Sequence, residues 1–464
     1  MIVPLNIEEP TIENICSSIK NNRYHRSQTS FRLLDAIHEA QFIGSSSIAL
    51  DGRWGSGKTF ILRQIYYALK HDPVYSDVFK EAASTHIEDY DASMTKSETS
   101  LFPDIYPVYY DAWSNDNELD PLISIMATIC QDLNFESDTE IRTRLSKMLD
   151  AFSLNIGPVS LQPSALINGM LGKNDINELL DKRKQKENIS EILSAIIDNL
   201  ASHRSTASVK KLLIIVDELD RCRPEFAAKL LERVKHYFDI ENVIFLFGTN
   251  IYALSSLLQQ QYGPAFPCSA YLNRFFDIRV TLPPISSREF LNSNNIDNSF
   301  ILNYCDLNSR FKVLAWISES YNLSIRDMLQ VFNEIQFFKS YGYDLDEQIA
   351  SQFIVVFLIP LLLILRRHDL DRFGEFINGN DKGPLEMLHK SDRSGYIFNC
   401  LYRHSASPSL DVQNGQISAI YDFLFSRSSR KNNDYLDVGN AKFNTNHRSL
   451  IHERFYEVIP IFPK

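Results

Sequence analysis

A cluster of three glycines constrains this chain more than any other feature of its sequence. Gly52, Gly55 and Gly57 fall within six residues, in a chain that has only 16 glycines among 464 residues. Glycine usually makes up about 7% of a protein. Because glycine has no Cβ, it adopts backbone angles that other residues avoid. The sequence therefore predicts a tight and unusual backbone turn at this place.

The three glycines belong to the segment GRWGSGKT at residues 52–59, which matches the phosphate-binding pattern GxxxxGK[ST] in full. In such a loop the glycines let backbone amides face phosphate oxygens, and the helix that follows adds its positive end. Average composition would give this pattern by chance in only about one or two chains per hundred of this length. A plain Gly/Ser turn with a surface lysine is therefore the weaker interpretation.

We expect the polar residues of the loop to have separate tasks. Lys58 would bring a positive charge to the β- and γ-phosphates, and the Thr59 hydroxyl would be a ligand of Mg²⁺. Trp54 would either stack on the nucleotide or pack beneath it. The predicted nucleotide-binding residues are Gly52, Trp54, Gly55, Ser56, Gly57, Lys58, Thr59 and Phe60.

A second segment ends in two acids. Residues 211–217, KLLIIVD, form a nearly continuous apolar run, which is typical of a central strand covered on both faces. Asp217 would hold Mg²⁺ through water at the end of this strand, and Glu218 would orient and deprotonate an attacking water. Two acids after a strand are common, so this interpretation depends on the phosphate-binding loop.

Three further residues are weaker candidates for the same site. Asn250 follows the apolar strand at residues 242–248, where a polar side chain can reach between the γ-phosphate and the water. The alternative for Asn250 is an ordinary turn after a strand. Arg274 would act as an arginine finger on the nucleotide of a neighbouring subunit, or it is a surface or ion-paired arginine. Arg326 would contact the γ-phosphate from a helical domain.

The arginines of the segment LDRCR, directly after the acid pair, have two possible roles. One of its arginines, Arg221 or Arg223, would couple the site to a partner subunit, or an arginine would simply pair with Asp220. Two aromatic residues further upstream, Tyr110 and Trp113, are interpreted as core residues.

Charge and cysteine content exclude several classes of protein. The formal net charge of −11 argues against a general nucleic-acid coat or a basic membrane-surface protein. The six cysteines are scattered, with no pair or Cys/His cluster at zinc spacing, and we interpret them as reduced thiols. The first residues lack the basic and apolar parts of a signal peptide. We therefore expect a cytoplasmic protein.

The longest apolar run lies in the second half of the chain. Residues 353–365, FIVVFLIPLLLIL, are interrupted by Pro360. A bilayer span needs about 20 such residues. The sequence therefore favours a buried, kinked helix over a segment that touches a membrane.

The order of the predicted elements indicates the fold class. Strands alternate with helices up to about residue 285, which predicts a three-layer α/β domain with a parallel sheet, of the P-loop NTPase type. Residues 1–285 would form this core, with an insert at about 135–208, and residues 286–464 a mostly helical region. The predicted strands are residues 46–51, 107–113, 211–217, 242–248 and 277–282, and the predicted core helices are residues 59–70, 121–134 and 224–238.

The chain resembles the KAP family of P-loop NTPases over roughly residues 27–335. The motifs that carry the resemblance are GRWGSGKT, YYDAWSND, LLIIVDELDRCRPEFAAKLLERVKHYF, VIFLFGTN, YLNRFFDIRVTLPP and LSIRDMLQVF. The acidic segment followed by Leu-Asp-Arg-Cys is the most specific of them, and the tryptophan motif supports it.

The resemblance implies an ATPase of the additional-strand type, with Glu218 catalytic, Asp217 on Mg²⁺ and Arg326 in the sensor region. The family usually has Asp-Asp where this chain has Asp217 and Glu218, a difference that favours turnover. Many members carry transmembrane helices in the insert. The insert here has no apolar span, which argues against membrane anchoring and leaves the insert as the place through which a membrane contact could still be made. Several bacterial relatives belong to anti-phage defence operons, which implies partners from the same operon or self-association.

Three functions compete at this stage. The first is a Mg²⁺-dependent ATP hydrolase that couples turnover to movement or assembly. The second is a nucleotide-gated switch or scaffold with little hydrolysis. A nucleic-acid motor or nuclease is weaker, because the basic stretches are short and the net charge is acidic. ATP is favoured over GTP, since no guanine-reading motif such as Asn-Lys-x-Asp follows the acid pair.

Overall fold

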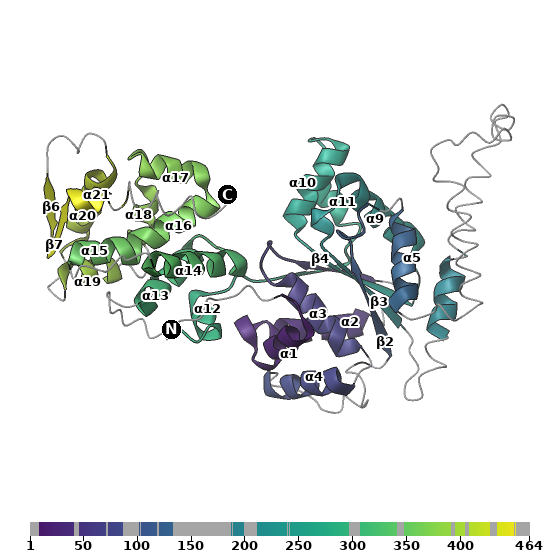
Figure 1. Ribbon diagram of the computed structural model, residues 1–464. Coiled ribbons are helices and arrows are strands. Elements are labelled where there is room, and N and C mark those ends of the chain that lie inside the picture. The colour runs from purple at the N-terminus through teal and green to yellow at the C-terminus, as the bar shows by residue number, and fades with distance from the viewer. Residues whose placement is uncertain are drawn as a thin grey trace. The chain divides into compact units, whose positions relative to one another are not determined.

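The chain divides into two compact units, with the boundary between Pro283 and Pro284 (Figure 1). We describe each unit by itself, from a computed structural model. The structure describes residues 9–40, 46–70, 73–86, 102, 104–117, 120–132, 187, 189–198, 211–238, 240, 242–296, 307–340, 348–390, 395–403, 408–426, 434–449 and 451.

The first unit is built on a parallel sheet of five strands. In the order in which they lie side by side, the strands are β2 (Ile105–Asp111), β3 (Lys211–Asp217), β4 (Val243–Thr249), β1 (Ser46–Asp51) and β5 (Ile278–Thr281). Every described residue of β3 and β4 is buried, as expected for central strands of a parallel sheet. Strand β4 lies between β1 and β3, so the glycine-rich loop and the acid pair follow strands that are separated by one additional strand.

Helices cover both faces of the sheet, because side chains of successive strand residues point to opposite faces. In β3, Leu213 and Ile215 pack against one helical layer, whereas Leu212, Ile214 and Val216 pack against the other. The first layer contains α1 (Ile12–Lys20), α2 (Ser27–Ala40), α3 (Lys58–Leu69) and α4 (Pro73–His86). The second contains α5 (Pro121–Asp132), the helical residues 189–198, α9 (Pro224–Tyr237), α10 (Ile251–Tyr262) and α11 (Cys268–Leu272).

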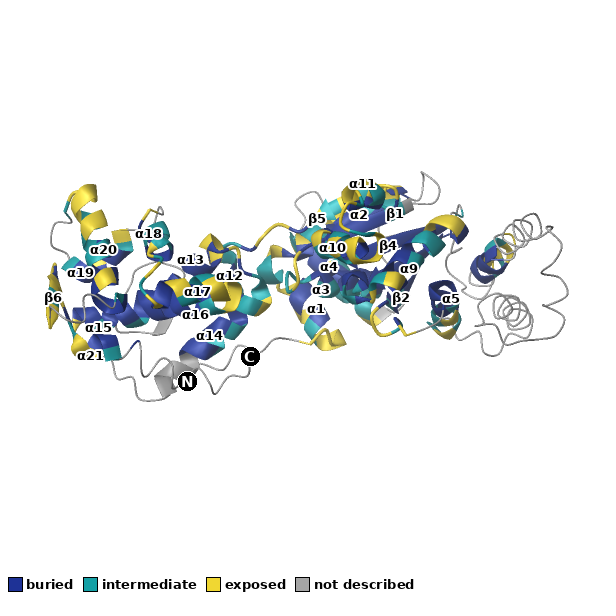
Figure 2. Cartoon of the chain, turned by 90° about the horizontal axis from the view of Figure 1, so that it is seen from above, coloured by how far each residue is buried: buried dark blue, intermediate teal, exposed yellow. Residues whose placement is uncertain are grey.

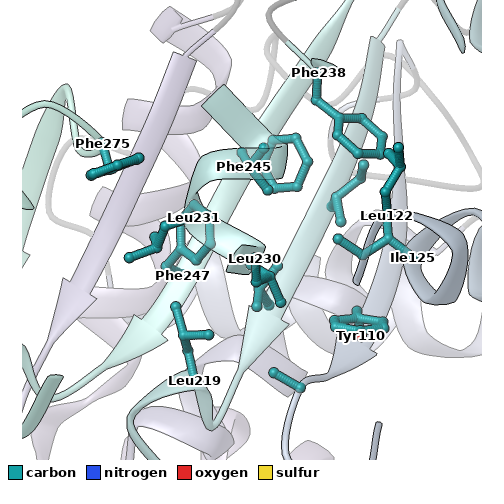
Figure 3. Close-up of a cluster of buried hydrophobic side chains, with 14 of the residues drawn as sticks. Tyr110, Leu122, Ile125, Leu219, Leu230, Leu231, Phe238, Phe245, Phe247 and Phe275 are labelled. Carbon is teal, nitrogen blue, oxygen red and sulfur yellow. The ribbon is translucent and has the colours of Figure 1, made fainter. Parts of the chain in front are cut away.

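Figure 3 shows the centre of the second layer, where rings and branched side chains from the strands meet those from the helices. Phe245 and Phe247 of β4, Leu230 and Leu231 of α9 and Tyr110 of β2 all belong to this buried cluster. The three-layer α/β fold predicted from the sequence is confirmed. Tyr110 is a core residue as predicted, whereas Trp113 is 51% exposed, so its interpretation as a core residue is wrong.

All five sequence-predicted strands agree with the structure to within two residues. The largest shift is in β2, which covers residues 105–111 rather than 107–113, because the chain turns at Ala112 after the last ladder residue Asp111. Helices α1, α2 and α4 add to the first layer. The insert predicted at residues 135–208 lies outside the described residues except for residue 187 and the helical residues 189–198.

The second unit is mostly helical. Its helices are α12 (Ser287–Ser293), α13 (Leu307–Ser320), α14 (Ile325–Ser340), α15 (Ile349–Phe353), α16 (Ile359–His368), α17 (Leu370–Ile377), α18 (Gly383–His389), α19 (Gly395–Tyr402), α20 (Leu410–Phe425) and α21 (Thr445–Ser449). A small antiparallel hairpin of β6 (Tyr435–Val438) and β7 (Ala441–Asn444) was not expected from the sequence. It brings Val438, Ala441 and Phe443 into buried positions.

The apolar run around Pro360 forms a helix with one wide turn. A π-helical segment, Ile354–Leu358, joins α15 to α16, and the amide of Ile359 bonds to the carbonyl of Ile354. This turn directly precedes Pro360, which has no amide to donate and would crowd a regular helix. The run is almost completely buried (Figure 2), so the prediction of a buried helix is confirmed, and the π-helical turn lies where a kink was predicted. Among the described residues, Ile349–His368 is the one helix long and apolar enough to cross a membrane by length and composition, and 78% of its most apolar window is buried.

Candidate nucleotide-binding site

The glycine-rich loop joins the end of β1 to the start of α3 and makes the tight turn that the sequence predicts. Gly55 and Gly57 have φ angles of 74° and 96°, in the left-handed region that favours glycine. Gly52 is needed for a different reason, because a Cβ there would lie 2.6 Å from Oγ of Ser56. Helix α3 begins directly at Lys58, with Gly57 as its cap. The amino-terminal end of α3 is thus open toward the loop, as phosphate binding requires.

Lys58 is folded back into the curve of this loop. Its Nζ donates hydrogen bonds to the carbonyl oxygens of Gly52 at 2.6 Å and Arg53 at 3.2 Å, and the residue is buried. Burial lowers the pKa of the Lys58 ammonium, whereas the nearby carboxylates of Asp220, Asp217 and Asp51 raise it, in that order. The lysine therefore provides the positive charge in a site that is otherwise rich in acids.

Asp217 lies at the carboxyl end of β3, is only 2% exposed and is held by several hydrogen bonds. Its Oδ2 accepts the hydroxyl of Tyr109 at 2.6 Å, its Oδ1 accepts the amide of Glu218 at 2.8 Å, and its carboxylate is also hydrogen-bonded to Thr59. Burial raises the pKa of Asp217, and these hydrogen bonds and Lys58 lower it. The structure thus brings together Lys58, Thr59 and Asp217.

The donor atoms at this place suit a magnesium ion. A threonine hydroxyl and a carboxylate are both hard oxygen ligands, and Mg²⁺ is usually bound by one or two such groups together with phosphate oxygens and water. Their close approach depends on Gly248 in the intervening strand β4. A Cβ at Gly248 would lie 2.2 Å from Cδ1 of Leu62 in α3 and 2.9 Å from Oδ1 of Asp217. No group of three or more His, Cys, Asp or Glu side chains forms a separate metal cluster in the described part of the chain.

Glu218 has an unusual backbone and an ion-pair partner. Its φ and ψ of 60° and 25° lie in the left-handed region, which is uncommon for a residue with a Cβ. Its Oε1 lies 2.9 Å from Nη1 of Arg221, and the Arg221 guanidinium lies 5.7 Å from the centre of the Trp113 ring. Burial raises the pKa of the Glu218 carboxyl, while Arg221 lowers it.

The local ion pairs differ from the expected pairing of an arginine with Asp220. Arg221 pairs with Glu218, and Arg223 pairs with Asp116 in the loop after β2. Asp220 instead accepts the indole N–H of Trp54 at 2.5 Å. Trp54 is 53% exposed, so this bond ties the rim of the glycine-rich loop to the acidic loop.

Two residues that were not predicted from the sequence, Asp51 and Tyr109, form hydrogen bonds that support the site. Asp51, at the end of β1, accepts the amide of Ile251 at 2.9 Å and lies 2.5 Å from Nη2 of Arg279, so it links the ends of β1, β4 and β5. Tyr109 bonds to Asp217 as described above. Asp51 could have been found from the sequence, because it lies directly before the glycine-rich loop. Nothing in the sequence shows that Tyr109, rather than Tyr110, points toward the acids.

The weaker candidates occupy different places. The side chain of Asn250 caps helix α10 by accepting the amide of Ala253 at 3.3 Å. Arg274 is exposed, in the turn between α11 and β5. The amide of Asp277, three residues later, bonds to the carbonyl of Ser47 at the start of β1. Arg274 therefore lies toward the opposite edge of the sheet from its own glycine-rich loop. Arg326 is exposed in the first turn of α14, in the second unit.

The buried charge of Asp217 makes a prediction about stability. Because burial raises its pKa in the folded protein, the ionised carboxyl destabilises the fold, and stability falls as pH rises through the folded pKa. Below the unfolded value of about 3.9 the carboxyl is neutral in both states. We expect Asp217→Asn to unfold at a temperature about 2–4 °C higher than the wild type at pH 7 in EDTA, for a gain of about 1 kcal/mol.

The difference should shrink as the pH approaches 4. The matched control is Asp120→Asn, which removes the partner of Lys229 and Arg233 on α9. The substitution removes a fully buried carboxylate from its two ion pairs, so this variant should unfold at a lower temperature. Thermal unfolding, monitored by circular dichroism, shows whether each variant unfolds at a higher or a lower temperature than the wild type. An Asp217→Asn variant less stable than the wild type at pH 7 contradicts the prediction.

Comparison with known proteins identifies the family of the first unit and of the adjoining helices. The model of the KAP family P-loop domain matches residues 26–342. No curated protein matches the chain. Similar solved structures include Orc1 of Aeropyrum pernix in complex with DNA, with 14% identity, coverage of 86% of this chain and 83% of that chain, and a TM-score of 0.32.

A Walker-type ATPase of Pyrococcus abyssi is 12% identical, with coverage of 90% and 92% and a TM-score of 0.28. A mutant of Thermotoga maritima RuvB is 11% identical, with coverage of 97% and 95% and a TM-score of 0.26. Similarity this low carries no argument about function. The family match spans more than half of the chain and includes every motif described above, and on that basis the chain belongs to the KAP family of P-loop NTPases.

Proposed function

We propose that this protein is a Mg²⁺-dependent ATP hydrolase. The observation that carries the proposal is the contact of Thr59, at the start of α3, with Asp217, at the end of β3, beside the buried ammonium of Lys58. This arrangement brings a glycine-rich turn, a cation, a hydroxyl and a carboxylate to one edge of the sheet, which supports a site for phosphate and for Mg²⁺. Glu218 follows Asp217 directly, so a carboxylate base is available next to the proposed metal site.

In the proposed reaction, the chain's own residues bind phosphate and move one proton. Lys58 would exchange its bonds to the carbonyls of Gly52 and Arg53 for bonds to phosphate oxygens. When Mg²⁺ is bound, it neutralises charge on the β- and γ-phosphates. After leaving Arg221, Glu218 would accept a proton from the water that attacks the γ-phosphorus, while the bond from that phosphorus to the departing ADP oxygen breaks. The raised pKa of Glu218 makes its carboxylate a stronger base than an ordinary glutamate.

Two observations support the second candidate, a nucleotide-gated switch with slow turnover. Glu218 is engaged by Arg221, so the base is not free to meet a water. Arg274 lies toward the edge of the sheet opposite its own glycine-rich loop, so it would complete a site only in another copy of the chain. Nucleotide binding would then drive assembly first, and hydrolysis would follow in the assembled form.

Substitution of the two central residues tests the hydrolase. Lys58→Ala should lower phosphate release by at least about 100-fold, because it removes the charge that stabilises the transferred phosphate. Glu218→Gln should lower it by a similar factor through loss of the base, and it should still bind ATP. The matched controls are Lys235→Ala and Glu225→Gln, which change exposed residues of α9. Wild-type rates in both site variants would sink the proposal.

Mixing of two inactive variants tests whether Arg274 acts between subunits. Lys58→Ala and Arg274→Ala should each be inactive alone, whereas their mixture should regain phosphate release, since one variant supplies the arginine and the other an intact loop. Light scattering should show a larger mass with ATP than without it. Arg288→Ala changes another exposed arginine and should behave as the wild type. Full activity of Arg274→Ala alone would identify Arg274 as an ordinary surface residue.

We further propose that the protein works in bacterial anti-phage defence in the cytoplasm, with partners from the same operon or with further copies of itself. This proposal rests on the family resemblance and on the free thiols of the five described cysteines. A bacterial host that expresses the complete operon should plate phage at least about tenfold less efficiently than one expressing the Lys58→Ala form. Equal plating for several unrelated phages would argue against the role.

A further inference from the structure

The hydroxyl of Tyr109 reaches the buried carboxylate of Asp217 from the neighbouring strand. The donor–acceptor distance is 2.6 Å, which is short and typical of a bond to an ionised group. Tyr109 lies in β2, where its backbone is paired with Ile215 of β3. Its side chain therefore extends along the sheet toward the carboxyl edge, where the acids are. The bond fixes Oδ2 of Asp217, while the amide of Glu218 fixes Oδ1.

The ring of Tyr109 is itself held from the glycine-rich side of the site. The guanidinium of Arg63 lies 3.5 Å from the ring centre, a close cation–π contact. The ring of Tyr66 meets Tyr109 edge to face, at a centre-to-centre distance of 5.9 Å. Both Arg63 and Tyr66 belong to α3, the helix that begins with Lys58 and Thr59.

These contacts form a closed loop of interactions. Arg63 follows Thr59 by four residues, so both side chains lie on one face of α3. Thr59 contacts Asp217, Asp217 accepts from Tyr109, and Tyr109 lies under Arg63. The carboxylate is consequently fixed relative to α3 by two separate routes. A carboxylate held in this way does not have to reorganise when a metal binds.

We propose that Tyr109 is a positioning residue for the magnesium site, which it supports by fixing the orientation of the Asp217 carboxylate. The proposal rests on the proposed function, since it takes Asp217 to be the magnesium carboxylate. Removal of a group that orients a metal ligand typically lowers metal affinity about 10- to 100-fold. Loss of the Tyr109 hydroxyl should therefore lower the affinity for Mg²⁺. It should lower the affinity for nucleotide only when Mg²⁺ is present.

The chain offers a closely matched control in the next residue. Tyr110 lies in the same strand, is fully buried and points to the opposite face, where its hydroxyl donates to Ser124 of α5 at 3.0 Å. Tyr109→Phe and Tyr110→Phe each remove one hydroxyl from β2, together with its hydrogen bond to Asp217 or to Ser124. A general loss of packing or stability would therefore affect both variants, whereas a magnesium effect belongs to Tyr109 alone.

The experiment is isothermal titration of the non-hydrolysable analogue AMP-PNP into the full chain, in EDTA and over a series of Mg²⁺ concentrations. We expect Tyr109→Phe to need about tenfold more Mg²⁺ for half of the magnesium-induced gain in affinity, with unchanged affinity in EDTA. Tyr110→Phe should match the wild type in both arms. An unchanged Mg²⁺ requirement for Tyr109→Phe, or an equal shift for Tyr110→Phe, overturns the proposal.

A second variant keeps the test decisive if Tyr109→Phe unfolds too easily. Arg63→Met removes the cation above the ring but leaves the hydroxyl, so it should raise the Mg²⁺ requirement in the same direction by a smaller factor. No shift in this variant counts against the inference. A wild type that binds AMP-PNP with Mg²⁺ dependence but releases no phosphate from ATP would contradict the hydrolase and leave the role of Tyr109 intact. Binding of AMP-PNP that does not depend on Mg²⁺ would overturn both.

Discussion

The close approach of helix α3 to the ends of β3 and β4 is the contact on which the rest of the site depends. Gly248 permits it, because any side chain at that position would overlap Leu62 and crowd Asp217. With the helix this close, Thr59 reaches a carboxylate from another strand and Lys58 is buried beside it. Burying a charge is costly unless it is paired and hydrogen-bonded. The tyrosine, amide and hydroxyl donors around Asp217 offset part of that cost, and burial still raises its pKa.

Much of this site could be predicted from the sequence, since its motifs are contiguous. The loop at residues 52–59 and the apolar run at residues 211–217 each specify their own local structure, and parallel pairing brings their ends to one edge of the sheet. The three-layer fold followed from the alternation of strands and helices. The catalytic and metal-binding roles of Lys58, Glu218 and Asp217 remain predictions, although the structure places these residues together.

Contacts between segments that are distant in the chain could not be predicted from the sequence. Whether Tyr109 or Tyr110 faces the acids depends on how β2 pairs with β3, because a shift of one residue in that pairing reverses the faces. The apolar pattern of β2 does not fix this pairing. The partner of Arg221 depends on the left-handed backbone of Glu218, which no composition rule predicts for a glutamate. The hairpin of β6 and β7 was missed because each strand has only four residues.

The two acids are held by contacts of different kinds, and this difference has a mechanistic consequence. Asp217 is almost completely buried and fixed by several bonds, so the proposed metal site is formed before any ligand arrives. The Glu218 side chain is held by an ion pair to Arg221, with side-chain exposures of 18% and 30%, and solvent weakens such a partly exposed pair. Its backbone is also in a strained region. In the proposed hydrolase, release of Glu218 is therefore the less costly rearrangement, and nucleotide binding would precede the activation of water as a separate step.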